Sequence, residues 1–339
     1  MKERTWRTGV ALALAASAVL PACSRKKPAE INPITPSFSV NRSRAPLGSA
    51  IEVTYTWTLD PNAKKLPQDY RALVHFLDSH KVVLFTDDHV PTPPVTAWEP
   101  GKAYSYSRTV FIPVYPYVGE VQVAMGLYPA AGRGERAAMK GEDLGLRAYK
   151  VAKMEFLPQT DNIFLVYKEG WHSPEASPQN PGLERTWSKK EALVSFKNPK
   201  KDVILHLEAD TNYKAFTEPP VLTVSVGGTT GLTIPIESSE VFLKKIRFKA
   251  ESLGTGDWVD LKLAMNQAFV PKAVGLNQDD RELGLLVYHL YVGEADKLGN
   301  VVGVVDAGPI AAPAPSPSPA AASKTKAKPP AKPAATPKK

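Results

Sequence analysis

The sequence predicts an all-β protein made of two antiparallel β-sandwich domains and a disordered C-terminal tail. Short segments in both halves of the chain alternate apolar and polar residues, which is typical of half-buried strands. The chain contains 32 prolines among 339 residues, and proline is poorly tolerated inside helices. Hydrophobic residues make up 43% of the sequence, which is enough to build cores of ordinary size.

The N-terminal segment has the features of an export signal. Basic residues within the first seven positions precede an apolar run over 9–20, which is too short to span a bilayer as a helix. The run ends in Leu20-Pro21-Ala22-Cys23, which resembles the lipobox of bacterial lipoproteins. The resemblance implies cleavage after residue 22 and attachment of lipid to Cys23, the only cysteine of the chain. We therefore expect a signal peptide over 1–22 and a membrane-proximal linker over 23–33.

Covalent lipid on Cys23 would make a membrane the first partner of the protein, and no other cofactor is expected. Several acyl chains anchor a protein firmly, and the basic residues Arg25, Lys26 and Lys27 would lie against anionic headgroups. The expected location is the cell membrane or the outer membrane, facing the periplasm or the exterior. The alternative interpretation is an ordinary secretory signal followed by an incidental cysteine.

Residues 34–155 are expected to form the first domain, an immunoglobulin-like β-sandwich. Residues 51–59 alternate apolar and polar side chains along their whole length, as a strand with one buried face does. Turn sequences rich in proline, glycine and asparagine separate this strand from the next candidates. Several short strands without a helical period are typical of this fold. The strand candidates are 51–59, 72–77, 81–85, 104–112 and 121–128.

Residues 156–295 are expected to form the second domain, a jelly-roll-like β-sandwich. The strand pattern restarts after Pro158, and the glycines at 227–228 and 254–256 mark turns between strands. Short strands joined in this way favour a second antiparallel sandwich. The strand candidates are 163–167, 192–196, 203–207, 221–226, 241–248, 258–263 and 285–292.

A linker over 296–310 is expected to lead into the tail, residues 311–339. The tail contains no large apolar residue that could form a core, so we expect it to be disordered. Its alternating prolines favour an extended polyproline conformation, and its six lysines are accompanied by no acidic residue. The tail either contacts an anionic envelope polymer or keeps the protein soluble.

The net charge of +8 is concentrated at the two ends of the chain. Residues 31–310 carry a net charge of −2, so the folded part is mildly acidic. A basic face for nucleic acid is therefore not expected, and nucleic acid is not among the expected partners. The single cysteine also excludes an intramolecular disulfide framework and a zinc site built from several cysteines.

Short motifs in both domains resemble the exoplasmic β-sandwich segments that accompany bacterial membrane glycosyltransferases and other cell-surface polysaccharide proteins. The resemblance implies a carbohydrate-binding-module-like fold for the second domain, an envelope setting, and an envelope polysaccharide or envelope protein assembly as partner. It does not imply transferase activity, because the sequence contains no multi-spanning membrane region. The motifs are PLG (46–48), YRALVHFLD (70–78), DDHVP (87–91), WEPG (98–101), G-L-Y (126–128), GWHSPE (170–175), RTW (185–187) and DDRELG (279–284).

A stretch rich in histidine and aspartate is the candidate for metal chemistry. A hairpin of residues 72–78 and 81–88 would bring His75 towards Asp87 and His89, and imidazole with carboxylate is a common ligand set. A metal-dependent hydrolase centred on these three residues is one hypothesis. The alternative is structural, because Asx turns and backbone hydrogen bonds at a strand end account for the same residues.

Trp171, Glu175, Arg185 and Trp187 are the candidate glycan-binding residues. Aromatic rings can stack on the apolar faces of sugars, and charged neighbours can bind the hydroxyl groups. The alternative is that both tryptophans fill the core, since aromatic side chains dominate cores, and that Glu175 and Arg185 form a structural clamp.

The sequence contains no motif of a known catalytic site. P-loop, dinucleotide-binding, nucleophile-elbow and His-Glu-x-x-His patterns are absent, and Asp279 and Asp280 are expected to bridge to Arg281 rather than to act in acid–base chemistry. The favoured hypothesis is a non-catalytic envelope lipoprotein that binds glycan or scaffolds a surface-polysaccharide or secretion assembly. The alternatives are the metal-dependent hydrolase and a structural tether between membrane and cell wall through the lysine-rich tail.

Overall fold

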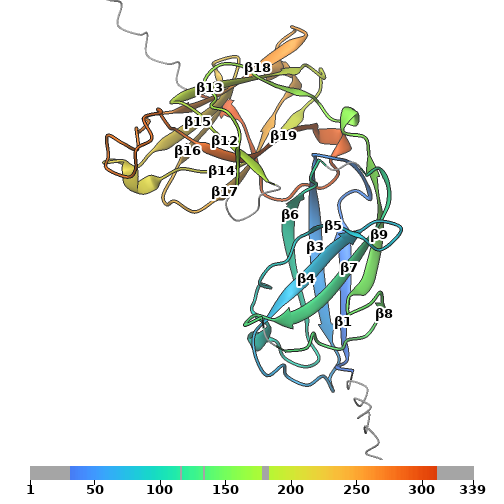
Figure 1. Cartoon of the computed structure of the whole chain (residues 1–339). Coiled ribbons are helices and arrows are strands. Elements are labelled where there is room, and N and C mark those ends of the chain that lie inside the picture. The colour runs from blue at the N-terminus through green and yellow to red at the C-terminus, as the bar shows by residue number, and fades with distance from the viewer. Residues whose placement is uncertain (1–30, 115–116, 133, 178–182, 311–339) are drawn as a thin grey trace, which may run out of the picture.

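The structure is a computed structural model that describes residues 31–114, 117–132, 134–177 and 183–310. This part of the chain is all-β, as the sequence predicts, and forms two sandwiches that follow one another along the chain (Figure 1). Cys23, the predicted signal peptide and the predicted tail lie outside the described residues. No helix of the described part is long and apolar enough to cross a membrane. Its helical segments are short 3-10 helices: η1 (Val95–Ala97), η2 (Gln159–Asp161), η3 (Tyr213–Ala215), η4 (Ala250–Leu253) and η5 (Ala295–Lys297).

The first sandwich contains nine strands in two sheets. They are β1 (Ile34–Val40), β2 (Arg44–Pro46), β3 (Ala50–Leu59), β4 (Tyr70–Leu77), β5 (Val83–Thr86), β6 (Ala103–Phe111), β7 (Gly119–Pro129), β8 (Glu142–Asp143) and β9 (Tyr149–Leu157). One sheet has the order β1-β3-β6, and the other has the order β2-β9-β7-β4-β5, with β8 paired to β9. Neighbouring strands are antiparallel except β2 and β9, which run parallel.

Alternation along β3 builds a large part of the first core. Tyr55 and Trp57 are fully buried between the sheets. Thr56, between them, points to the opposite face, where its hydroxyl shares a 2.7 Å hydrogen bond with Ser105 of β6. Each buried aromatic side chain removes roughly 150–250 Å² from water, so this strand anchors the small sheet on the larger one.

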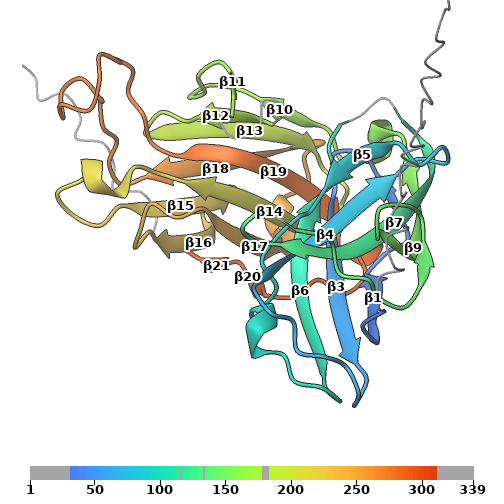
Figure 2. The same ribbon diagram turned by 60° about the horizontal axis from the view of Figure 1, so that its bottom comes forward.

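The second sandwich consists of two six-stranded sheets, seen at the left of Figure 2 beside the first sandwich. Its strands are β10 (Leu165–Tyr167), β11 (Glu175–Ala176), β12 (Glu184–Trp187), β13 (Glu191–Lys197), β14 (Val203–Asp210), β15 (Val221–Val226), β16 (Thr230–Pro235), β17 (Phe242–Phe248), β18 (Trp258–Met265), β19 (Leu286–Glu294), β20 (Val304–Asp306) and β21 (Gly308–Pro309). One sheet has the order β10-β13-β18-β15-β16-β21, and the other has the order β11-β12-β19-β14-β17-β20.

The segment 296–310, which the sequence predicts as a linker, belongs to the second sandwich instead. β20 pairs in parallel with β17, and β21 pairs with β16, so this segment adds one edge strand to each sheet. Strands of two or three residues are too short for an alternating pattern, which is why the sequence did not reveal them.

The two sandwiches meet where the start of β3 and the end of β6 face β14, β17 and β19 (Figure 1). Glu52 of β3 is 7% exposed and forms a 2.7 Å ion pair with Lys245 of β17. Phe111 of β6 stacks on His289 of β19, with ring centroids 4.1 Å apart. The contact between the domains therefore combines a buried ion pair with aromatic packing. A small apolar cluster lies beside it: Ala50, Ile204, Tyr291 and Leu298.

Candidate functional site

The edge strand β11 and its neighbour β12 bring three of the predicted glycan-binding residues together. Their register places Glu175 opposite Arg185. Trp187 follows Arg185 by two residues, so both side chains point to the same face of the strand. Each of the three residues is half-buried. This charged and aromatic edge, with the neighbouring residues described next, is called the β12 site: Glu175, Arg185, Trp187, Asp210, Arg281 and Tyr288.

Asp210 of β14 and Tyr288 of β19 extend the β12 site across the sheet. The Tyr288 hydroxyl donates a 2.8 Å hydrogen bond to Asp210 Oδ2, and Arg185 lies within hydrogen-bonding reach of the same hydroxyl. Burial raises the pKa of the Asp210 carboxyl above its usual value. Arg185 Nε is buried and has no hydrogen-bond partner among the described residues. Within the described part of the chain, the guanidinium therefore keeps a hydrogen-bond donor that no protein group uses.

Arg281 joins the β12 site through its contact with Glu175. Its guanidinium forms ion pairs with Glu175 at 2.8 Å and with Asp279 at 2.7 Å. The predicted bridge between Asp279 and Arg281 is therefore confirmed, and the hydrogen bonds from Arg281 lower the pKa of Asp279 to about 2. Glu175 pairs with Arg281 and not with Arg185, so the clamp considered from the sequence has a different cationic partner.

The two candidate tryptophans have different surroundings. Trp187 lies edge-on to Phe269, with 6.0 Å between the ring centroids. It is half-buried and remains a candidate glycan-binding residue of the β12 site. Trp171 donates a 2.9 Å hydrogen bond from its indole to the Leu193 carbonyl oxygen in the opposite sheet. Its ring packs against the second core and against Tyr167. Trp171 therefore connects the two sheets, in line with the packing interpretation, and is not a free stacking surface.

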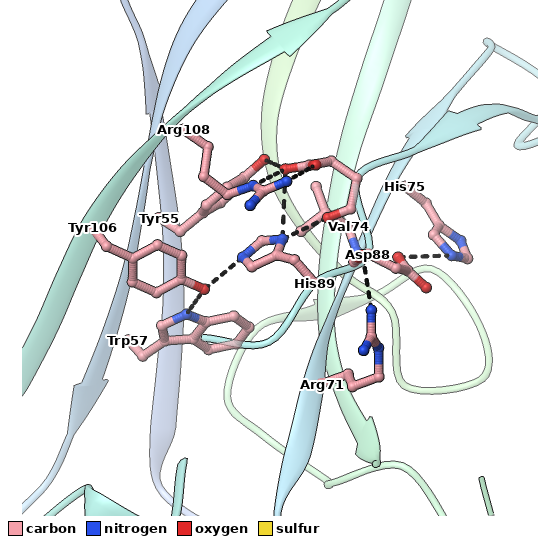
Figure 3. A network of polar contacts seen from close by, with 10 residues as sticks. Tyr55, Trp57, Arg71, Val74, His75, Asp88, His89, Tyr106 and Arg108 are labelled. Carbon is pink, nitrogen blue, oxygen red and sulfur yellow. Dashed lines mark hydrogen bonds and ion pairs between the residues drawn. The ribbon is translucent and has the colours of Figure 1, made fainter. Parts of the chain in front are cut away.

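The residues of the hypothetical metal centre belong to a hydrogen-bond network in the first sandwich (Figure 3). The Asp87 carboxylate accepts hydrogen bonds from the Tyr55 hydroxyl at 2.8 Å and from Arg108 at 2.8 and 2.9 Å. The ring nitrogens of His89 contact the Asp87 carbonyl oxygen at 2.6 Å and the Tyr106 hydroxyl at 2.8 Å. Both carboxylate oxygens of Asp87 and both ring nitrogens of His89 are thus engaged within the protein.

His75 lies with Asp88 rather than with Asp87 and His89. His75 Nε2 is 3.7 Å from Asp88 Oδ1, and the same oxygen accepts a hydrogen bond from the Val74 backbone (Figure 3). Burial lowers the pKa of both His75 and His89. In the part of the chain that the structure describes, no three side chains of His, Cys, Asp or Glu are arranged to hold a metal ion. The hypothesis of a metal centre on these three residues is therefore wrong in its geometry.

Sequence reasoning did not identify Asp210 and Tyr288, or the pairing of Arg281 with Glu175. The available signal was a polar residue at an outward position of a strand, as for Asp210 in β14. Polar outward positions are common on the solvated face of any antiparallel sheet. They become recognisable as one site only when the register of β12, β19 and β14 is known.

Comparisons with known proteins give distant likenesses. No protein-family model and no curated protein matches this chain. A family GH115 4-O-methyl-α-glucuronidase with specificity for decorated arabinogalactans is 15% identical at a TM-score of 0.28, and the match covers 40% of this chain and 18% of that one. The CBM22-1–CBM22-2 tandem domain of Paenibacillus barcinonensis Xyn10C is 9% identical at a TM-score of 0.24, over 80% of this chain and 99% of that one. The M60 catalytic domain of Clostridium perfringens ZmpB with its two CBM51 domains is 9% identical at a TM-score of 0.21, over 80% and 32%.

Proposed function

We propose that this protein is a non-catalytic cell-envelope lipoprotein that binds glycan through its second sandwich. The β12 site carries the proposal, because it gathers Arg185, Asp210 and Tyr288 beside the half-buried ring of Trp187. Sugars offer several hydroxyl groups close together, and ionised side chains make the stronger hydrogen bonds to such groups. An apolar surface with a few placed polar groups is the common form of a small-ligand site.

A lipid anchor on Cys23 would hold the β domains at the envelope surface, on the cell membrane or the outer membrane. Stable membrane attachment needs two signals, such as several acyl chains or one chain with a basic patch. The sequence offers both, since Cys23 is followed by Arg25, Lys26 and Lys27. An envelope polysaccharide or a polysaccharide-handling assembly is the proposed partner.

Trp187→Ala, Arg185→Ala and Tyr288→Phe are each expected to weaken retention of the protein on purified envelope polysaccharide by about tenfold, as truncation of a central binding residue does. Tyr288→Phe removes a single hydroxyl and so tests hydrogen bonding with the least change in packing. Lys189→Ala, at an exposed position just after β12, is the matched control and should bind like the wild type. Thermal unfolding of each variant shows that the fold is intact. Unchanged retention of all three site variants would remove the β12 site from the proposal.

Cys23→Ala is expected to move the protein from the membrane fraction to the soluble fraction and to abolish incorporation of labelled palmitate. The fractions are compared after a high-salt wash, because salt removes purely electrostatic attachment. Ser24→Ala serves as the control, since it leaves the cysteine in place. Membrane retention of Cys23→Ala in high salt would contradict lipid anchoring at this residue.

A further inference from the structure

Trp258, the first residue of β18, is the most exposed tryptophan in the described part of the chain. Its side chain is 56% exposed. Alternation along β18 sends Val259 and Leu261 into the second core, so Trp258 and Asp260 point to solvent. Burial of a large aromatic ring is strongly favourable, but single exposed apolar side chains are common on protein surfaces, so the groove beside Trp258 carries the argument. The other described tryptophans are buried or half-buried: Trp57, Trp98, Trp171 and Trp187.

An open groove of about 590 Å³ runs beside this ring, on the outer face of the sheet that contains β10, β13 and β18. Its volume lies within the range of roughly 300–1,000 Å³ found for ligand sites. The groove is lined by Lys168, Glu169, Leu193, Ser195, Trp258 and Asp260.

The register of β13 and β18 builds the groove from alternate positions of both strands. Ser195 is paired with Asp260, and Lys197 is paired with Trp258, so all four side chains belong to the outward face. The Ser195 hydroxyl donates a 2.5 Å hydrogen bond to Asp260 Oδ1. This bond fixes the direction of the carboxylate and leaves its second oxygen without a partner among the described residues.

Two further charged side chains in the groove have no hydrogen bond or ion pair to another described residue. They belong to Lys168 and Glu169, and both are exposed. Their backbones are held by β13, because Lys168 N donates to the Leu193 carbonyl oxygen and Leu193 N donates to the Glu169 carbonyl oxygen. The groove thus offers an apolar ring, an oriented carboxylate, and a free donor and acceptor on fixed backbone.

We infer that this groove is a second carbohydrate site, in which Trp258 stacks on a sugar ring while Asp260, Glu169 and Lys168 bind its hydroxyl groups. The ring supplies a flat apolar surface for the C–H face of a pyranose, and the polar groups flank it on one side. The lining holds two carboxylates and one lysine, and Lys197 lies beside Trp258 on the same face, so the charges balance and the groove suits a neutral polysaccharide rather than a polyanion.

The groove is distinct from the β12 site, because β13 and β18 belong to one sheet of the second sandwich and β12 belongs to the other. The inference stands on Trp258 and its neighbours alone and does not require the β12 site to bind glycan. If both sites bind the same polymer, their combined affinity exceeds that of either site, since the second contact becomes intramolecular.

The test is affinity gel electrophoresis of the full chain in detergent, in gels that contain hydroxyethyl cellulose, laminarin, galactomannan or arabinoxylan as neutral probes, or polygalacturonate as the acidic probe. The wild type is expected to be retarded by at least one neutral polysaccharide and not by polygalacturonate. Trp258→Ala should weaken that retardation by about tenfold or more, and Trp258→Phe, which keeps an aromatic ring, should restore a large part of it. Phe164→Ala is the matched control, because Phe164 is 72% exposed and does not line the groove.

Iodide quenching of tryptophan fluorescence gives a second readout, which reports on the exposure of the Trp258 ring itself. The bound neutral polysaccharide should shield the exposed Trp258 ring and reduce quenching in the wild type, and this protection should be absent in Trp258→Ala. Unchanged quenching on binding would overturn the stacking role of Trp258.

The outcomes separate this inference from the proposed function. Wild-type retardation that survives Trp258→Ala but is lost in Trp187→Ala overturns the groove and leaves glycan binding at the β12 site in place. Loss in Trp258→Ala with binding intact in Trp187→Ala supports the groove and leaves the β12 site to the test with envelope polysaccharide described above. Absence of wild-type retardation on every neutral probe, or retardation by polygalacturonate alone, overturns the groove as a neutral-sugar site.

Discussion

Asp87 lies between the two sheets of the first sandwich and connects them through its carboxylate. It follows β5 of the larger sheet, and its oxygens accept hydrogen bonds from Tyr55 on β3 and Arg108 on β6 of the smaller sheet (Figure 3). Burial, and then the negative charge and hydrogen bonding of Asp87, raise the pKa of Tyr55. The phenol is therefore protonated at neutral pH and donates its hydrogen bond to the carboxylate.

Asp87→Asn is expected to lower the free energy of unfolding by about 2 kcal/mol, because it removes the negative charge that Arg108 and Tyr55 share but keeps the shape of the side chain. Urea unfolding measures the change as a shift of the midpoint at constant slope. Glu155→Gln is the matched control. Its ion pair with Arg44 lies at the surface, where the Arg44 side chain is 66% and the Glu155 side chain 45% exposed. Exposed pairs of this kind contribute about 0–1 kcal/mol to stability. Equal midpoints for both variants would show that the network adds no stability.

The chemistry of single residues was predictable where their partners are close in sequence. Asx turns were the alternative considered for the stretch rich in histidine and aspartate, and in it Asp78 Oδ1 accepts hydrogen bonds at 2.8 Å from the backbone N–H groups of His80 and Val82. The metal hypothesis failed because the partners of Asp87 come from β3 and β6. The sequence shows that carboxylates and imidazoles lie near each other, but not which of their atoms are already engaged by distant strands.

At the level of elements, regular alternation decided what could be predicted. β15 has the bounds expected from the sequence, Val221–Val226, because apolar and polar residues alternate from Leu222 to Val226 and two glycines follow. β9 was missed because charged residues at 150, 153 and 155 interrupt its pattern and its pairing with β7 contains a register shift. β11 and β12 were missed because strands of two and four residues are too short for a periodic signal.

The strands that carry the β12 site could therefore not be predicted from the sequence. Three of its residues could be, because their side-chain chemistry suits glycan binding. Glu175 meets Arg185 through a local hairpin-like pairing, which residue spacing alone could suggest. Asp210 and Tyr288 join them only through the ladder of β14 with β19, two segments far apart in the chain. The strand of Trp258 was predictable from its alternation, but the groove beside the ring depends on the register of β13 with β18.

At the scale of the whole molecule, the contact between the sandwiches was not predictable, since it joins residues far apart in the sequence. His206 of β14 is 1% exposed at this contact. Its Nε2 lies 3.9 Å from Glu52 Oε1, and its Nδ1 has no partner among the described residues. Lys245 and Arg42 lie close enough to oppose a positive charge on the ring. Burial first, and these two cations next, lower the pKa of His206 to about 3.

This buried histidine makes the joined domains sensitive to acid. The pKa of His206 rises from about 3 in the folded protein to its ordinary value of 6.5 on unfolding, so the unfolded chain binds the additional proton between these values. The stability that neutral His206 contributes is complete above pH 6.5 and is lost progressively as the pH falls towards 3.

His206→Gln removes the titrating group, so its free energy of unfolding is expected to depend less on pH between 6.5 and 4 than that of the wild type. The difference in the pH-dependent loss over this range should approach about 3 kcal/mol. Carboxylates elsewhere titrate equally in both proteins, so the comparison isolates the histidine.

His80→Gln, in an exposed turn, is the control and should follow the wild-type curve. Urea unfolding at several pH values measures the curves. Parallel curves for His206→Gln and the wild type would mean that the ring is already solvated or charged in the folded state, and that the domain contact does not hold it neutral.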